Sequence, residues 1–212
     1  MSSNAPDAML FITPGCPHCP VVLQGLSELV KEGAIGALEV VNVAERPERA
    51  AELGVRSAPW TRIGHYILQG AQSPAELKAW AERAADDAGD TEYLRELVGS
   101  GRLDEAEAYV GEQADRLKGV IPLLEETDAP MQVRLGAGAL LESQAGSETL
   151  QALIPELGGL TRHADHRIRG DACHYLGLTG SADAISYLRA CENDSSQEVR
   201  EIAAESLESL GG

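Results

Sequence analysis

Aromatic residues and bases are both scarce in this sequence. Phe11 is the only phenylalanine, and the only tryptophans are Trp60 and Trp80. Leu, Val, Ile and Ala must therefore build most of the core. The 17 Lys and Arg residues face 34 Asp and Glu residues, which gives a net charge of −17. This excess of acid argues against nucleic acid or an anionic membrane as a partner, because phosphates attract Lys and Arg.

The sequence also lacks any apolar run of membrane-spanning length. Its first ten residues, MSSNAPDAML, have neither the basic segment nor the apolar segment of a secretory signal. We therefore expect a cytoplasmic protein with no membrane partner. Cysteines are few as well, namely Cys16, Cys19, Cys173 and Cys191. In a reducing compartment a close CxxC pair is catalytic or metal-binding more often than structural.

The charge is distributed unevenly, which indicates two units with different surfaces. Residues 1–85 hold 9 acids and 7 bases, whereas residues 86–212 hold 25 acids and 10 bases. We predict a redox domain over 1–85, a helical linker or hairpin over 86–114 and a helical-repeat domain over 115–212.

The first 85 residues predict the order βαβαββα. Short apolar runs bounded by Gly and Pro indicate the strands, and helix-spaced apolar residues after Pro17, Pro47 and Pro74 indicate the helices. The expected strands cover residues 8–13, 38–43, 60–63 and 66–68.

The last part of the chain contains an internal repeat in the pattern aliphatic-Arg-x-x-Ala-x-x-x-Leu. The pattern begins at Val133, at Ile168 and at Val199, and each copy follows another helical segment. This segment resembles HEAT repeats, in particular the short HEAT-like repeats of phycobilisome lyases. The resemblance implies stacked helix pairs whose apolar faces are buried against neighbouring repeats.

The Cys16-Pro17-His18-Cys19 segment carries the chemistry. Cys16 follows a predicted buried strand and sits at the N-cap of a helix that we expect Pro17 to open, with His18 one residue inside it, where it can add donor character or positive charge. The free amides at a helix N-terminus favour a thiolate, and lower the pKa of a thiol by one or more units from about 8.5. We predict Cys16 as the nucleophile and Cys19, one turn further on and less exposed, as the resolving thiol. The alternatives are half of a metal site or an inert pair.

The segment TPGCPHCP resembles the active-site loop of the thioredoxin superfamily and is close to that of protein disulfide oxidoreductases and glutaredoxin-like domains. The Pro after the second Cys is most similar to archaeal protein disulfide oxidoreductases and to the N-terminal domain of the alkyl hydroperoxide reductase flavoprotein. The resemblance covers about residues 8–85. It implies that Pro59, in VRSAP, is a cis-proline facing the cysteines, and that the Ala58 backbone pairs with an extended substrate. Trp60 replaces the Thr of thioredoxins, so its ring either shapes the substrate groove or packs. The buried acid of thioredoxins is replaced by Leu10.

The distal cysteines and histidines are expected to be structural. Cys173 and Cys191 fall in small or core positions of adjacent repeats, where a second redox pair is the alternative. His163, His166 and His174 look like possible ligands, but the His-Glu pairs of iron-binding HEAT-like proteins are absent, and solvated or capping roles are favoured.

The sequence therefore predicts a thiol–disulfide oxidoreductase whose only redox group is the Cys16–Cys19 pair, with no metal or other cofactor. Its substrate would be a protein disulfide or dithiol, and the helical repeats would bind a protein partner. Two alternatives stay open. One is a glutaredoxin-type enzyme acting on glutathione mixed disulfides, and the other is a redox-regulated adaptor without turnover.

Overall fold

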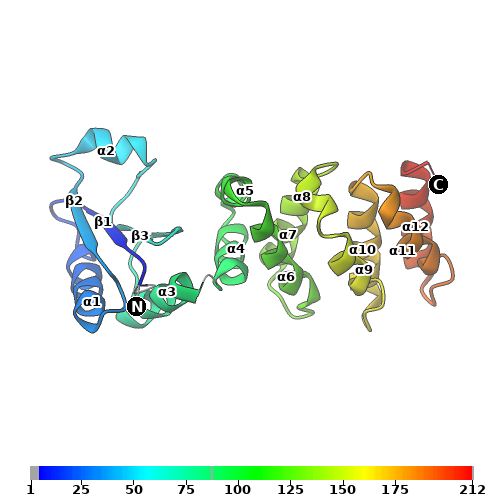
Figure 1. Cartoon of the computed structure of the whole chain (residues 1–212), viewed down its shortest axis with the longest axis horizontal. Coiled ribbons are helices and arrows are strands. Elements are labelled where there is room, and N and C mark those ends of the chain that lie inside the picture. Colours follow the sequence, from blue (N-terminus) through cyan, green and yellow to red (C-terminus); the bar gives the residue numbers. More distant parts are fainter. Residues whose placement is uncertain (1–4, 87, 212) are drawn as a thin grey trace. The chain divides into compact units, whose positions relative to one another are not determined.

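The computed structural model describes residues 5–86 and 88–211. The chain divides between residues 89 and 90 into two compact units, each of which is described by itself below (Figure 1). None of the helices in the described residues combines the length and the apolar character needed to cross a bilayer.

The first unit is a four-stranded sheet in the order β2-β1-β3-β4, flanked by helices. β1 and β2 are parallel, whereas β1–β3 and β3–β4 are antiparallel. The elements are β1 (Ala8–Ile12), α1 (Cys19–Glu32), β2 (Leu38–Asn42), α2 (Pro47–Glu52), β3 (Trp60–Ile63), β4 (Tyr66–Gln69) and α3 (Pro74–Asp86). The predicted order βαβαββα is confirmed.

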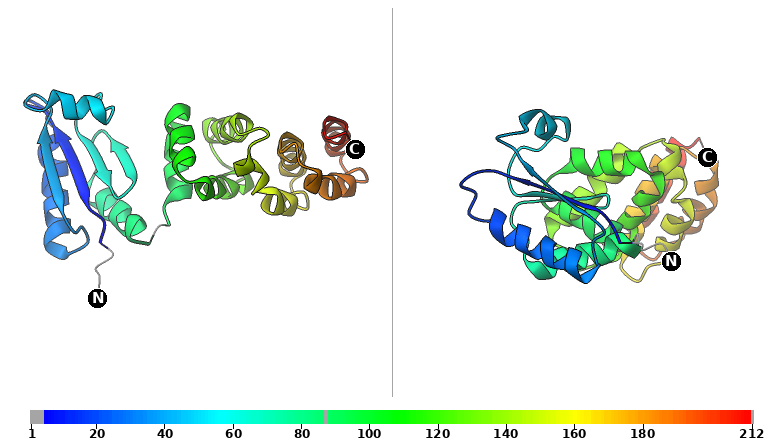
Figure 2. Two further views of the ribbon diagram at one scale, coloured as in Figure 1. Left: turned by 45° about the horizontal axis from the view of Figure 1, so that its top comes forward. Right: turned by 60° about the vertical axis from the view of Figure 1, so that its left-hand side comes forward.

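Helices cover both faces of this sheet, and α2 lies on the opposite side from α1 (Figure 2). Successive strand residues point to opposite faces. Met9, Phe11 and Trp60 accordingly pack with Ala50 of α2. Leu10 is completely buried, and so are Val22 and Leu26 of α1 and Leu77 of α3.

A capping box begins α3. The Ser73 hydroxyl accepts the Glu76 amide at 3.3 Å, and the Glu76 carboxylate accepts the Ser73 amide at 2.7 Å. These hydrogen bonds lower the pKa of Glu76. The chain leaves the unit where the Gly89 amide donates to the Tyr66 hydroxyl at 2.8 Å. A Cβ at Gly89 would lie 2.6 Å from that oxygen, so only glycine fits without a shift.

The described residues of the second unit form helices joined by turns and loops, without a strand. Its elements are α4 (Asp90–Gly99), α5 (Leu103–Glu112), η1 (Ala114–Val120), α6 (Ile121–Glu125), α7 (Met131–Ser143), α8 (Glu148–Gln151), α9 (Ile154–Leu160), α10 (His166–Leu178), η2 (Ala182–Ala184), α11 (Ile185–Cys191) and α12 (Gln197–Ser209). The predicted repeat falls on α7, α10 and α12. Its aliphatic, Ala and Leu positions are all buried, namely Val133, Ala137, Leu141, Ile168, Ala172, Leu176, Val199, Ala203 and Leu207.

The predicted linker or hairpin over 86–114 forms a helical hairpin, α4 and α5, which packs as part of this helical stack. Gly136 of α7 lies so close to α4 that a Cβ would come within 2.6 Å of the Val98 side chain and 2.8 Å of its carbonyl oxygen. α5 also contacts α7. The buried faces of α4 and α5 therefore have the same role as those of the repeats that follow.

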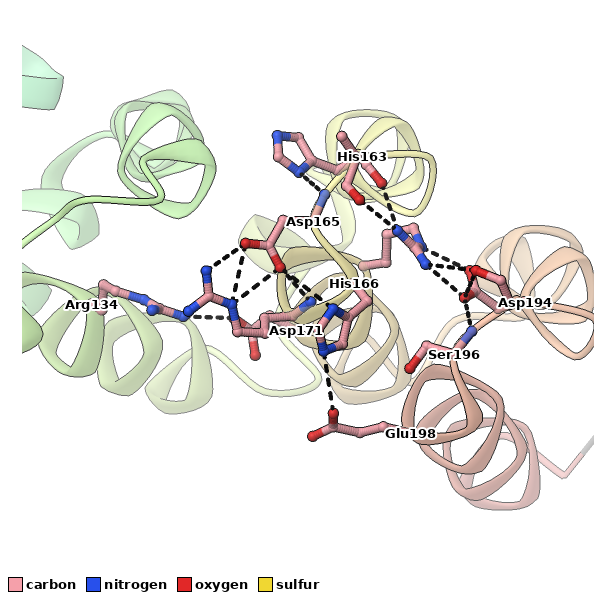
Figure 3. A network of polar contacts seen from close by, with 12 residues as sticks. Arg134, His163, Asp165, His166, Asp171, Asp194, Ser196 and Glu198 are labelled. Atoms are coloured by element: carbon pink, nitrogen blue, oxygen red, sulfur yellow. Dashed lines mark hydrogen bonds and ion pairs between the residues drawn. The ribbon is translucent and has the colours of Figure 1, made fainter.

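In the second copy of the repeat, the arginine clamps neighbouring helix pairs together through Asp194 and the loop of His163, both of which Figure 3 labels. Arg169 donates twice to Asp194, at 2.7 Å each, and also to the carbonyl oxygens of His163 and Ala164. Arg169 thus joins the loop that precedes α10 to the loop that precedes α12. Arg134 makes no such clamp among the described residues. Its guanidinium lies 3.8 Å from the carboxylate of Asp171.

Candidate redox site

The predicted cysteines are joined in a disulfide, with their Cα atoms 5.6 Å apart. β1 delivers the chain to the Pro14-Gly15 turn, where Gly15 has a φ of 78°, in the region that favours glycine. Cys16 is partly exposed and Cys19 is buried, so the prediction that Cys16 is the more accessible thiol is confirmed.

The helix begins later than the sequence suggested. We expected Pro17 to open it and His18 to lie inside it, but His18 is the N-cap and Cys19 is the first helical residue. Pro20, at the start of α1, has the fixed φ that suits a first turn. The predicted placement of Cys16 at the N-cap is therefore wrong, because Cys16 lies in the loop just before the helix.

The helix nevertheless acts on Cys16 directly. The Cys19 backbone amide donates to Cys16 Sγ at 3.1 Å. This amide belongs to the first turn, whose N–H groups have no partner within the helix and carry partial positive charge. After reduction the same amide would stabilise a thiolate on Cys16. His18 is exposed at this end of the helix.

The second segment of the site meets the first at Cys16. The Ala58–Pro59 peptide bond is cis, as predicted. The Ala58 carbonyl oxygen lies 3.7 Å from Cys16 Sγ, although the two residues are 42 positions apart. A backbone beside an exposed disulfide offers an extended substrate a place to pair, which is the role that the resemblance implies for Ala58 and Pro59.

Trp60 does not line this site as a surface residue. Its side chain is only 3% exposed, and its ring packs edge-on against Phe11 with 5.4 Å between centroids. Of the two alternatives for Trp60, the structure therefore supports packing. The other alternative, a substrate-binding ring that shapes the groove, does not fit this burial.

Thr61, which belongs to none of the sequence motifs, pairs with Leu10 across β1 and β3. Thr61 is fully buried, and its hydroxyl has no hydrogen-bond partner among the described residues. The available signal was a polar residue at a core-facing position of a strand. Leu10, which stands where thioredoxins carry a buried acid, is also fully buried.

The distal cysteines and histidines lie in the second unit. Cys173 and Cys191 are buried free thiols, and the neighbouring Cys191 thiol together with burial raises the pKa of Cys173. His163 Nδ1 accepts the amide of Asp165 at 3.0 Å, which is a capping role. Within the described residues, no group of three or more His, Cys, Asp or Glu side chains is arranged to hold a metal.

Comparisons with known proteins agree with both units. Residues 8–82 match the family model described as a thioredoxin domain, and residues 117–208 match the one described as HEAT repeats. A thioredoxin of Methanocaldococcus jannaschii is 37% identical over 51 residues, which are 24% of this chain and 60% of that protein. A probable thioredoxin of Archaeoglobus fulgidus is 32% identical over 71 residues, or 32% of this chain and 78% of that protein.

The first unit is thus a thioredoxin-like domain with a CxxC disulfide. The chain belongs to the thioredoxin family through this domain, which is fused to HEAT-like repeats. These likenesses and the Cys16–Cys19 disulfide support a thiol–disulfide redox function.

Proposed function

We propose that the protein is a thiol–disulfide oxidoreductase that acts on protein disulfides through Cys16 and Cys19, in the cytoplasm. In the reducing direction, the Cys16 thiolate attacks a substrate disulfide, forms a mixed disulfide and releases one substrate thiolate. Cys19 then attacks Cys16 Sγ, which releases the second substrate sulfur. The substrate gains two electrons, and the protein is left with the Cys16–Cys19 disulfide.

One observation carries this proposal. The partly exposed Cys16 Sγ accepts the first amide of α1 and lies beside the Ala58 carbonyl oxygen. The nucleophile therefore has both a group that stabilises its thiolate and a neighbouring backbone for the substrate. No other cysteine of the chain is exposed, since Cys19, Cys173 and Cys191 are all buried.

We further propose that the helical repeats bind the protein partner. Residues 86–212 carry 25 of the 34 acids and only 10 of the 17 bases. A repeat stack offers an extended surface, and a surface field of one sign speeds encounter with a partner of the opposite sign. A basic protein surface is the complement of this unit.

Reduction of insulin disulfides by the full-length protein, with dithiothreitol as electron donor, tests the proposal. Cys16→Ser should abolish the acceleration over dithiothreitol alone, whereas Cys19→Ser should accumulate a mixed disulfide on Cys16. Cys173→Ala is the matched control, because the third repeat carries Ala204 at the equivalent position. A Cys16→Ser variant as active as the wild type would refute the assignment.

A second substrate distinguishes the glutaredoxin-type alternative from the proposed dithiol mechanism. With a glutathione mixed disulfide as substrate, a reaction that needs Cys16 alone would survive Cys19→Ser. Retention of that activity, with no insulin reduction by the wild type, would replace the proposed dithiol mechanism by the glutaredoxin-type one. An adaptor without turnover would show neither activity.

A further inference from the structure

The two most exposed large apolar side chains of the described chain lie together on one helix. Met131 is 76% exposed and Leu135 is 68% exposed, and both belong to α7. Residues four apart on a helix share one face. Leaving two such side chains in water forgoes their burial energy, so this face stands out from the rest of the stack.

The other two copies of the repeat carry different residues at these positions. When the copies are aligned on their arginines, Met131 corresponds to His166 and Gln197, which are polar. Leu135 corresponds to Gly170 and Glu201. The repeat fold therefore does not require apolar residues at these places, and their presence on α7 needs another reason.

A groove of about 640 Å³ lies beside this face, between α7 and α10. Tyr175 of α10 approaches Gly138 of α7, where a Cβ would come 2.9 Å from the tyrosine hydroxyl. Leu135 also borders a second hollow, of about 440 Å³, towards Val98 and Leu103. The lining residues that matter here are Met131, Arg134, Leu135, Glu142, Asp171 and Tyr175.

The charges of the groove are two carboxylates and one guanidinium. Glu142 lies 3.6 Å from His174, and Asp171 lies 3.8 Å from Arg134 (Figure 3 shows the latter pair). Both separations are longer than a direct hydrogen bond. Asp171 is partly buried, which raises its pKa, and among the described residues no group donates a hydrogen bond to it. A cation from a partner would supply the missing hydrogen-bond donor to Asp171.

The loop sequence explains why Arg134 faces Asp171 rather than acting as a clamp. Arg169 reaches Asp194 in the loop before the next repeat helix. The residue equivalent to Asp194 in the preceding loop is His163, whose Nδ1 already accepts a backbone amide. Arg134 therefore finds no carboxylate in that loop position, and the junction beside the groove is left without the clamp.

We propose that this groove binds a segment of the protein partner in which an aliphatic side chain is flanked by Lys or Arg. The aliphatic group would cover Met131 and Leu135, and the cation would pair with Asp171 and Glu142. This proposal rests on the proposed binding role of the repeats and assigns it to one face. The acid excess of the unit favours a basic segment over an acidic one.

Methionine-methyl NMR of the full-length protein tests the proposal site by site. The chain has three methionines, of which Met9 is buried in the sheet and Met131 borders the groove. A short synthetic peptide alternating Lys with Leu should shift the Met131 methyl signal in a saturable way and leave that of Met9 unchanged. Peptides with Glu in place of Lys, or Ser in place of Leu, should bind about tenfold more weakly or not at all.

Leu135→Glu is the decisive variant, because the third repeat carries Glu201 at this position and the fold accepts it. It should weaken binding of the Lys-Leu peptide about tenfold, by removal of apolar contact. Ala204→Glu adds the same charge at an exposed position of α12 and should leave binding unchanged.

Three outcomes would overturn the proposal. They are no Met131 shift with the Lys-Leu peptide, equal binding of the Glu and Lys peptides, and a Met131 signal that changes with protein concentration alone, which would make the occupant a second copy of this chain. None of these outcomes depends on the cysteines. Failure here therefore leaves the insulin assay intact, and failure of that assay leaves this one interpretable.

Discussion

At the scale of single residues, the reactivity of Cys16 depends on one backbone amide. The Cys19 N–H donates to Cys16 Sγ, while Cys19 itself is 5% exposed. In the reduced protein we expect iodoacetamide to modify Cys16 about tenfold faster than Cys19 or more at neutral pH, because the thiolate is the reacting species. Peptide mass spectrometry after brief alkylation measures the ratio. Faster labelling of Cys19 would reverse the two roles.

Thr61 offers a stability test that leaves the chemistry aside. Its buried hydroxyl has no partner among the described residues, so Thr61→Val removes an unpaired polar group at nearly constant shape. We expect the free energy of unfolding to rise by about 1 kcal/mol. Thr179→Val is the matched control, because the equally buried Thr179 hydroxyl donates to the Leu176 carbonyl oxygen at 2.6 Å. That variant should be less stable by about 1 kcal/mol. Denaturant unfolding of both variants measures these changes, and a loss of stability in Thr61→Val would contradict the prediction.

Single residues also show where sequence reasoning ends. The CxxC motif and the cis bond at Pro59 follow from residue types at fixed spacing. The start of α1 does not, because Pro17 and Pro20 are both compatible with a first turn, and only the path of the folded loop selects Pro20. Trp60 was likewise ambiguous, since a large ring after the cis-proline suits a groove or a core equally well. In the structure the Trp60 ring contacts Phe11 on the neighbouring strand, which places it in the core.

At the scale of elements, the contribution of the Arg169 clamp to stability can be compared with that of Arg134, the equivalent arginine that forms no clamp. Arg169→Ala breaks the bonds to Asp194 and to two loop carbonyls, and should lower the free energy of unfolding by about 2 kcal/mol. Arg134→Ala, at the same position of the preceding repeat, should cost less than about 0.5 kcal/mol because its ion pair is long and only partly buried. Equal losses in urea denaturation would refute the clamp.

The clamp also predicts a direction of pH dependence. The hydrogen bond from Arg169 holds the pKa of Asp194 at about 2, below its ordinary value of 3.8. A carboxylate with a lowered folded pKa stabilises the fold fully above its unfolded pKa and loses that effect as the pH falls through the folded pKa. Between pH 5 and pH 2, Asp194→Asn should therefore lose less stability than the wild type. Urea melts across that range supply the comparison, and parallel losses would contradict it.

The sequence predicts an element well where apolar residues recur at helical spacing. It predicts an element poorly where contact with a neighbouring helix determines which residues are buried. The apolar spacing of α7, α10 and α12 fixed their buried faces. The hairpin of α4 and α5 has the same amphipathic character but lacks the repeat signature. Its place in the stack became clear only from the approach of Gly136 to Val98. The groove was not predicted either, because exposure depends on which neighbouring helix covers a residue.

At the scale of the whole molecule, each unit has its own core, so chemistry and binding should be separable. A piece comprising residues 1–89 should reduce insulin at a rate within about twofold of the full chain, since every contact made by Cys16 lies inside it. The same piece should react with the protein partner more slowly than the full chain does. Added salt should narrow that difference, because it screens surface charges beyond about 8 Å. Loss of insulin reduction on truncation would mean that the repeats support the active site.

The missing clamp at Arg134 has a mechanical consequence. α10 packs along much of α12, but it touches α7 at few positions. Among the described residues, the polar contacts between these two helices are the long ion pairs Arg134–Asp171 and Glu142–His174, and a backbone bond joins Gly146, beyond the end of α7, to Leu178 of α10. In a repeat stack each repeat contacts only its neighbours, so the resistance to bending at each position depends on the interface there. The weakest interface is the one between α7 and α10, so a pulling or bending force would separate the stack there first. The parts on either side would then move as two rigid bodies, and the stack would not unfold from its end.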